Sequence, residues 1–212
     1  MFNSQELYDA ILNGDAKKAH AATQAALAEG ADPMQLIAGS MVPAMDEVGK
    51  LFEAEEYFVP ELLLAGRAMK SAMELIRPLL ISSGQKMAVR VIIGTVKGDL
   101  HDIGKNIVAS MLEGSGFEVV DLGTDVSPEN FVAAVKERNP HVVCMSALLT
   151  VTMPAMKTTI DALRAAGVRT QVKVLIGGAP VTSQYAREIG ADGYSENAGG
   201  AVSLVKSLLA TA

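Results

Sequence analysis

The 212-residue chain has only one cysteine and three histidines, which limits the metal sites that it can build. Cys144 alone cannot form an internal disulfide or a zinc site of several cysteines, and it lies in an apolar run where we expect it to pack. His20 and His141, which we expect to be structural, do not lie in strand-end loops that could converge on His101. A zinc or di-iron centre is therefore disfavoured, and a reducing compartment is favoured.

Long apolar runs and clusters of basic residues are also missing. No stretch approaches the roughly 20 apolar residues that cross a membrane, and the polar residues 2–6 lack the features of a signal peptide. The net charge of −6 and the lack of a segment rich in Lys and Arg argue against nucleic acid as a partner. We therefore expect a cytoplasmic protein without membrane or nucleic-acid contacts.

The first part of the chain has the apolar period of helices. From residue 5 to about residue 82, apolar side chains such as Leu36, Met41 and Met45 recur at spacings that place them on one stripe. Asp and Pro near residues 14–15, 30–33 and 57–60 mark helix starts, because Asp caps a helix and Pro is tolerated in its first turn. The pattern predicts a bundle of about four helices over residues 1–84, and a small, polar linker near residues 82–85.

Beyond residue 85 the period changes to that of alternating strands and helices. Strands are predicted at residues 89–93, 118–120, 141–145, 172–176 and, weakly, 191–193, and helices near residues 103–115, 128–139, 153–166, 180–189 and 198–210. Short apolar strands that are each followed by a helix predict an α/β fold with a doubly wound, five-stranded parallel sheet of the flavodoxin-like kind. Such sheets bind ligands at the carboxyl ends of their strands, where the strand order reverses.

The loop after the first predicted strand holds a histidine between two aspartates. The imidazole of His101 could ligate a transition metal, and Asp99 or Asp102 could accept its second N–H and fix the tautomer. Gly98 and Gly104 would let the backbone approach a bulky ligand, and Gly104 would also let the next helix start tight against the sheet. A simple capped turn would contain the same residues. A metal with one protein ligand implies a cofactor that brings its own ligands, such as haem or a corrin.

Three motifs, each at the end of a predicted strand, resemble the signature of cobalamin-binding domains. They are Asp99-Leu100-His101-Asp102-Ile103-Gly104, Ser146-Ala147-Leu148 and Gly177-Gly178. Residues 45–53 and 57–62 are similar to the helical cap domain of cobalamin-dependent methionine synthase and of corrinoid methyl-carrier proteins. The resemblance implies a helical cap domain at residues 1–84 and a cobalamin-binding α/β domain at residues 85–212.

The resemblance also implies the site. Methylcobalamin or a related corrinoid would bind with its own dimethylbenzimidazole displaced from cobalt and with His101 as the lower metal ligand. Asp99 would hydrogen-bond the imidazole, and Thr152, where the family often has serine, would complete a catalytic relay that lets the ligand exchange a proton. Other residues at matching cofactor-binding positions are Gly98, Leu100, Asp102, Ile103, Gly104, Ser146, Leu148, Thr150, Gly177, Gly178, Tyr194 and Ala198. Cap residues that match positions over the upper corrin face are Phe52, Phe58, Val59 and Leu62.

The function implied by the resemblance is that of a methyl carrier. A substrate-specific methyltransferase would load the cobalt from a methyl donor, and an acceptor methyltransferase would pass the methyl group to a thiol or a tetrahydrofolate-type acceptor. A reductive activase is a further implied partner. The chain would be the corrinoid subunit of a methyltransferase system rather than a complete enzyme. Two alternatives stay open: a cobalamin-binding sensor, which would need a DNA-binding module, and the small subunit of an adenosylcobalamin mutase, which would not be expected to carry this cap.

Overall fold

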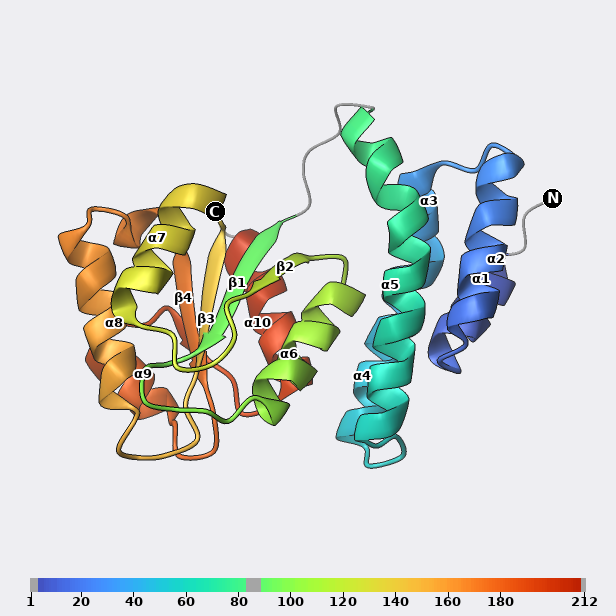
Figure 1. Cartoon of the computed structure of the whole chain (residues 1–212). Helices are drawn as coiled ribbons and strands as arrows, with labels where there is room; N and C mark the ends of the chain where they lie inside the picture. The colour runs from blue at the N-terminus through green and yellow to red at the C-terminus, as the bar shows by residue number, and fades with distance from the viewer. Residues whose placement is uncertain (1–3, 83–88, 211–212) are drawn as a thin grey trace. The chain divides into compact units, whose positions relative to one another are not determined.

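The computed structural model describes residues 4–82 and 89–210 (Figure 1). Its contacts divide the chain into a helical unit, Met1–Ala88 with Ser110–Phe117, and a sheet unit, Val89–Ala109 with Glu118–Ala212. The predicted linker at residues 82–85 and the predicted domain boundary after residue 84 lie outside the described residues, except for Ser82 at the end of a helix. Within the described residues, no helix is long and apolar enough to cross a membrane.

The helical unit forms the predicted bundle. Its elements are α1 (Ser4–Leu12), α2 (Ala16–Ala28), α3 (Pro33–Leu36), the π-helical turn η1 (Ile37–Met41), α4 (Val42–Glu53) and α5 (Val59–Ser82). Because α3, η1 and α4 follow one another without a break, they act as one helix. Asp15 caps α2 by accepting the N–H of Lys18 at 3.0 Å, and Asp32 caps α3 in the same way. The predicted stripe is buried, including Leu36, Met41 and Met45.

The sheet unit alternates strands and helices as predicted. Its elements are β1 (Arg90–Thr95), α6 (Ile103–Gly114), β2 (Glu118–Asp121), α7 (Pro128–Arg138), β3 (Val142–Ser146), α8 (Pro154–Ala165), the 3-10 turn η2 (Arg169–Gln171), β4 (Lys173–Gly177), α9 (Ser183–Ile189), β5 (Gly193–Tyr194) and α10 (Ala198–Ala210). Helix α6 begins in this unit, and its residues from Ser110 onward belong to the helical unit. The five strands are parallel and lie in the order β2-β1-β3-β4-β5, which is the predicted flavodoxin-like order.

Two elements near the chain end start later than the sequence pattern predicts. Helix α9 begins at Ser183 rather than at residue 180, because Thr182 caps it by accepting the N–H of Tyr185 at 3.1 Å. Strand β5 begins at Gly193 rather than at residue 191, because α9 ends in a left-handed cap at Gly190 and the N–H of Ala191 still donates to the carbonyl of Ala186 in that helix.

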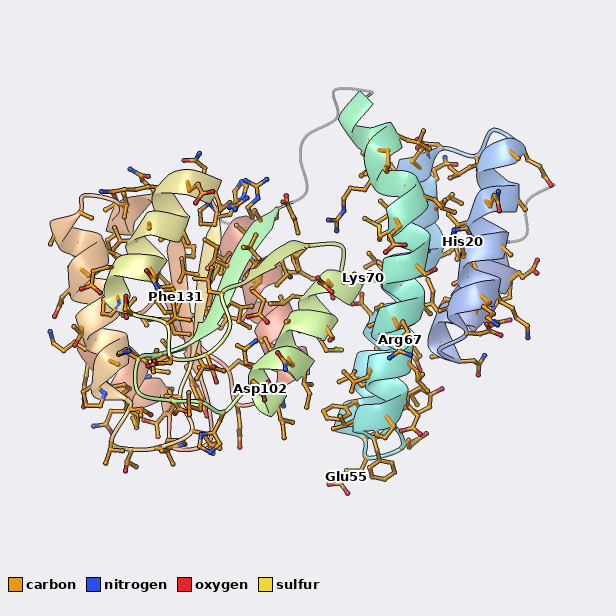
Figure 2. All side chains as sticks on the ribbon, in the orientation of Figure 1. His20, Glu55, Arg67, Lys70, Asp102 and Phe131 are labelled. Atoms are coloured by element: carbon orange, nitrogen blue, oxygen red, sulfur yellow. The ribbon has the colours of Figure 1, made fainter. Side chains whose placement is uncertain are left out.

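Helices cover both faces of the sheet, with α6 and α10 on one face and α7, α8 and α9 on the other (Figure 1). Phe131 of α7, which Figure 2 labels, is completely buried in the core between the sheet and the second helical layer. The chain leaves β1 toward β2 on one side and reaches β3 on the other side, so the strand order reverses between β1 and β3. The fold thus predicts a ligand site at the carboxyl ends of these two strands.

Candidate functional site

The strand register brings the three sequence motifs to one edge of the sheet. Thr95 at the end of β1 pairs with Ser146 at the end of β3, and Ser146 pairs with Gly177 at the end of β4. The loops that carry His101 and Leu148 therefore leave the sheet side by side, at the place where the strand order reverses. The two loops are also in direct contact: the N–H of Leu148 donates to the carboxylate of Asp99 at 2.8 Å.

Asp99 is the centre of this contact, and its side chain is 0% exposed. One carboxylate oxygen, Oδ1, lies 2.7 Å from Nδ1 of His101 and accepts the backbone N–H of His101 at 3.1 Å. The other oxygen, Oδ2, accepts the Thr152 hydroxyl at 2.7 Å and the N–H groups of Leu148 at 2.8 Å and Leu149 at 3.4 Å. The structure thus brings together the three residues of the predicted relay.

The hydrogen bonds from these donors keep the Asp99 carboxylate ionised. Burial by itself would raise the pKa of Asp99, but the hydrogen bonds from Thr152, from the backbone of Leu148 and from His101 outweigh burial and hold this pKa well below its usual range. An ionised carboxylate only accepts hydrogen bonds, so the proton of the neutral imidazole is held on Nδ1 of His101. Asp99 therefore fixes the tautomer that leaves the Nε2 lone pair free.

The His101 side chain is 50% exposed, and within the described parts of the chain no hydrogen bond involves its Nε2 atom. An imidazole whose Nδ1–H is held by a carboxylate and whose Nε2 faces outward is the usual arrangement of a histidine metal ligand. Of the two aspartates considered from the sequence, Asp99 makes this bond. Asp102 is exposed at the start of α6 (Figure 2) and bonds Asn106 instead.

Thr95 and Lys105 hold the same loop, although the sequence motifs did not single them out. The buried hydroxyl of Thr95 donates to the backbone carbonyl of His101 at 2.8 Å. Lys105 in the first turn of α6 has a side chain that is 1% exposed and pairs with Asp121 at the end of β2. The position of Thr95 at a strand end was the only sequence signal for such a role.

Large apolar side chains are exposed on the loops around His101. Leu100 and Ile103 are each 74% exposed, and Leu148 and Leu149 are each 43% exposed. Val151, at 80%, was not among the predicted site residues. Water-exposed apolar side chains gathered beside a free imidazole indicate a site for a large, mostly apolar ligand, and a corrin ring fits this description.

The predicted glycines have different roles. Gly178 has φ +126°, and a Cβ atom there would lie 1.9 Å from the carbonyl oxygen of Ala147, so the fold itself requires glycine. Gly98 also has a positive φ, +85°. The prediction that Gly104 lets α6 start tight against the sheet is wrong, because a Cβ atom there would meet no atom of residues 4–82 or 89–210 within 4 Å. Gly104 instead borders open space beside His101, which suits the approach of a ligand.

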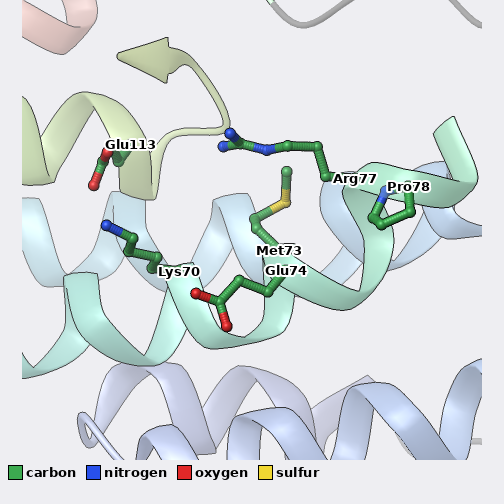
Figure 3. Close-up of a pocket in the computed structure, with 6 residues that line it drawn as sticks. All are labelled: Lys70, Met73, Glu74, Arg77, Pro78 and Glu113. Carbon is green, nitrogen blue, oxygen red and sulfur yellow. The ribbon is translucent and has the colours of Figure 1, made fainter. Parts of the chain in front are cut away.

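The other predicted positions range from buried to exposed. Ser146, Gly177 and Tyr194 are half-buried, Thr150 is exposed, and Ala198 is buried at the start of α10. In the helical unit, Phe58 is exposed, Phe52 and Val59 are half-buried, and Leu62 is buried. A hollow of about 430 Å³ in the same unit contains none of these residues (Figure 3); its lining consists of Lys70, Met73, Glu74, Arg77, Pro78 and Glu113.

Two residues that were expected to be structural have packing or backbone roles. Cys144 is buried in β3, and burial raises the pKa of its thiol to about 12, so this thiol is a poor metal ligand. The Nδ1 atom of His141 accepts the backbone N–H of Arg90 at 3.1 Å and thus helps to join β3 to β1.

Comparison with known families decides the identity of the two units. Residues 89–203 match the family described as B12 binding domain, and residues 4–77 match a second family with the same description. The chain belongs to the corrinoid proteins with B12-binding domains. The predicted corrinoid cofactor and the predicted fold, a helical cap followed by a five-stranded parallel sheet, are therefore confirmed.

Several known proteins are similar to this corrinoid protein over nearly its whole length. It is 46% identical to the trimethylamine corrinoid protein of Methanosarcina barkeri, over 99% of each chain. It is 44% identical to dimethylamine corrinoid protein 1 of Methanosarcina acetivorans, over 97% of each chain. Among solved structures, the methanol:cobalamin methyltransferase complex of Methanosarcina barkeri matches with a TM-score of 0.85 and 31% identity, over 99% of this chain and 80% of that chain. A cobalamin-binding protein of Desulfitobacterium hafniense matches with a TM-score of 0.78 and 37% identity, over 98% of each chain.

The predicted function of this corrinoid protein is confirmed by these similarities: it is a methyl carrier of a methyltransferase system. A methyltransferase is accordingly its partner. The sensor and mutase-subunit alternatives are not supported.

Proposed function

We propose that this corrinoid protein carries methyl groups from a methylamine, with His101 as the lower ligand of cobalt. The donor class is supported by relatives named trimethylamine and dimethylamine corrinoid proteins, which are 41% to 47% identical to this chain. The ligand assignment is carried by one observation, the Nδ1 contact of 2.7 Å between His101 and the buried carboxylate of Asp99.

When bound, the corrin supplies a cobalt atom that accepts and releases a methyl group. Asp99 keeps the proton on Nδ1 of His101 rather than taking it, because its own pKa is held so low. The Thr152 hydroxyl lies within hydrogen-bond distance of both Asp99 Oδ2 and the carbonyl of Leu149, at 2.7 and 2.8 Å, so it ties the carboxylate to the loop after β3. This array orients the imidazole before the cofactor arrives.

The remaining site residues would contact the cofactor without ligating cobalt. Leu100, Ile103 and Leu148 would exclude water from the lower face of the corrin, and Gly98, Asp102 and Gly104 would border it. Small or half-buried residues at the carboxyl edge would line the path of the displaced nucleotide tail: Ser146, Thr150, Gly177, Gly178, Tyr194 and Ala198. In the helical unit, Phe52, Phe58, Val59 and Leu62 are proposed to contact the upper face of the corrin.

The proposed partners are two methyltransferases, one specific for the methylamine and one for the acceptor, which would be a thiol or a tetrahydrofolate-type molecule. A reductive activase would return oxidised cofactor to the cycle. Substrate choice would then lie with the first methyltransferase, while this chain supplies the common carrier.

Methyl loading by purified partners tests the proposed donor. The protein reconstituted with hydroxocobalamin and reduced is mixed with trimethylamine, dimethylamine or methanol methyltransferase and the matching donor, and methylation of the cofactor is followed by absorption. We expect loading with an amine and its methyltransferase at least about tenfold faster than with methanol. Faster loading from methanol would overturn the proposed donor class.

A further inference from the structure

Asp125, in the loop between β2 and α7, holds the His101 loop from the side opposite Thr152. Its carboxylate accepts the backbone N–H of Gly98 at 2.8 Å and pairs with the ammonium group of Lys97 at 3.0 Å. Its own backbone N–H donates to the carbonyl of Asp99 at 2.9 Å. Asp125 thus makes three contacts with the three residues that lead into the metal-ligand loop.

The backbone of Asp125 has φ +53°, which few residues other than glycine adopt. Such a conformation persists only where the surroundings favour it. Here the left-handed turn aims both the carboxylate and the N–H of Asp125 at the same loop, and Gly98 facing it also has a positive φ, +85°. The hydrogen bond from Gly98 and the charge of Lys97 lower the pKa of Asp125, so its carboxylate stays ionised at neutral pH.

Asp99 is therefore held at both ends. Its carboxylate is fixed by Thr152 and Leu148 on the β3 side, and its carbonyl is fixed by Asp125 on the β2 side. These contacts hold the backbone and the side chain of Asp99 in the orientation in which Oδ1 faces Nδ1 of His101. Loss of the Asp125 carboxylate would remove the bonds to the N–H of Gly98 and the ammonium group of Lys97. The segment that leads into Asp99 would then be held less firmly, and the 2.7 Å contact between Asp99 and His101 would lengthen.

We propose that Asp125 is a positioning residue that sets the strength of cobalt ligation by His101 without touching the cofactor. The inference rests on the proposed function, because it requires His101 to be the cobalt ligand. Loss of the Asp125 side chain should lower the ratio of His101-ligated to unligated cobalt about tenfold, the factor expected for one or two lost hydrogen bonds.

Electron paramagnetic resonance of the reduced cobalt(II) form measures this ratio directly. The variants Asp125→Ala, Asp125→Asn and His101→Ala are produced with histidine labelled with the heavy nitrogen isotope and reconstituted with hydroxocobalamin. Histidine ligation then gives two-line splitting, whereas the cofactor's own unlabelled base gives three lines. We expect Asp125→Ala to shift the ratio of two-line to three-line signal about tenfold toward three lines. Asp125→Asn should stay close to the wild-type ratio, because asparagine tolerates positive φ and its amide oxygen can accept the N–H of Gly98.

Asp192 provides the matched control at the opposite edge of the sheet. Its carboxylate also accepts a backbone N–H, from Val174 at 2.6 Å, and pairs with a cation, Arg169 at 2.8 Å. Asp192→Ala should therefore destabilise the fold in a similar way while leaving the two-line signal unchanged. If the two-line signal is lost in His101→Ala but keeps its wild-type strength in Asp125→Ala, the role of Asp125 is overturned while ligation by His101 stands. A signal that persists in His101→Ala would overturn the proposed ligation and the inference with it.

Discussion

At the residue scale, the site depends on a carboxylate that is buried yet ionised. Asp99 accepts hydrogen bonds from the side chains of His101 and Thr152 and from the N–H of Leu148. Each of these donors is itself fixed by the fold, so the imidazole keeps its orientation and its tautomer without the cofactor. Threonine at position 152 can make the contact expected of serine, since its hydroxyl lies 2.7 Å from Asp99 Oδ2.

Acid should weaken the fold through Asp99. Because its folded pKa lies below the unfolded value, its contribution to stability is complete above about pH 5 and is lost as pH falls below about 4 toward the folded pKa. We expect Asp99→Asn to be less stable than the wild type by about 1–3 kcal/mol at neutral pH, and this difference to shrink in acid. Urea unfolding of both apoproteins at a series of pH values measures the difference. A constant difference down to about pH 2 would show that the charge of Asp99 contributes nothing.

At the element scale, the carboxyl edge of the sheet explains how distant motifs become one site. The pairing of Thr95 with Ser146 and of Ser146 with Gly177 aligns the ends of β1, β3 and β4. The loops that follow these strands therefore start next to one another. Backbone contact is so close at Gly178 that a Cβ atom would overlap the carbonyl of Ala147. Gly104 is the opposite case, since no atom of the described residues lies within 4 Å of the place where its Cβ atom would be.

These two glycines give a matched pair of substitutions. Gly104→Ala should leave the apoprotein unchanged or stabilise it by up to about 1 kcal/mol, because alanine favours the helix. It should weaken cobalamin binding at least about tenfold if the ring approaches the backbone there. Gly178→Ala, the contrasting variant, should destabilise the apoprotein by more than about 3 kcal/mol. Thermal unfolding and cobalamin titration separate the effects, and undiminished cobalamin affinity in Gly104→Ala would exclude a close approach.

Sequence patterns predicted the elements better than the contacts between them. Helix α7 begins at the predicted residue 128, where Ser127 caps it and Pro128 takes its first position. The starts of α9 and β5 were missed because the cap bond from Tyr185 to Thr182 and the helix-end bond from Ala191 to Ala186 do not show in the apolar period. Asp125 was not predicted either, since it meets Gly98 across 27 positions of the chain and only the pairing of β1 with β2 brings them together.

At the scale of the whole molecule, the chain combines two units that each match a B12-binding family. The sheet unit holds the predicted ligand and its supporting hydrogen bonds, and the helical unit contains the exposed Phe58 that we propose for the upper face. The identity to trimethylamine and dimethylamine corrinoid proteins extends over both units. The residues predicted from the three motifs lie at one edge of the sheet unit. We propose that the partner methyltransferase, rather than this chain, selects the substrate.

The absorption spectrum of bound hydroxocobalamin tests the central claim, that His101 ligates cobalt. The wild type and His101→Ala are each reconstituted, freed of unbound cofactor and measured under the same conditions. Because Asp99 and Thr152 remain in place, the variant should fold and bind the corrin, but its spectrum should shift to that of a cofactor without a histidine ligand. A variant spectrum identical to that of the wild type would contradict ligation by His101.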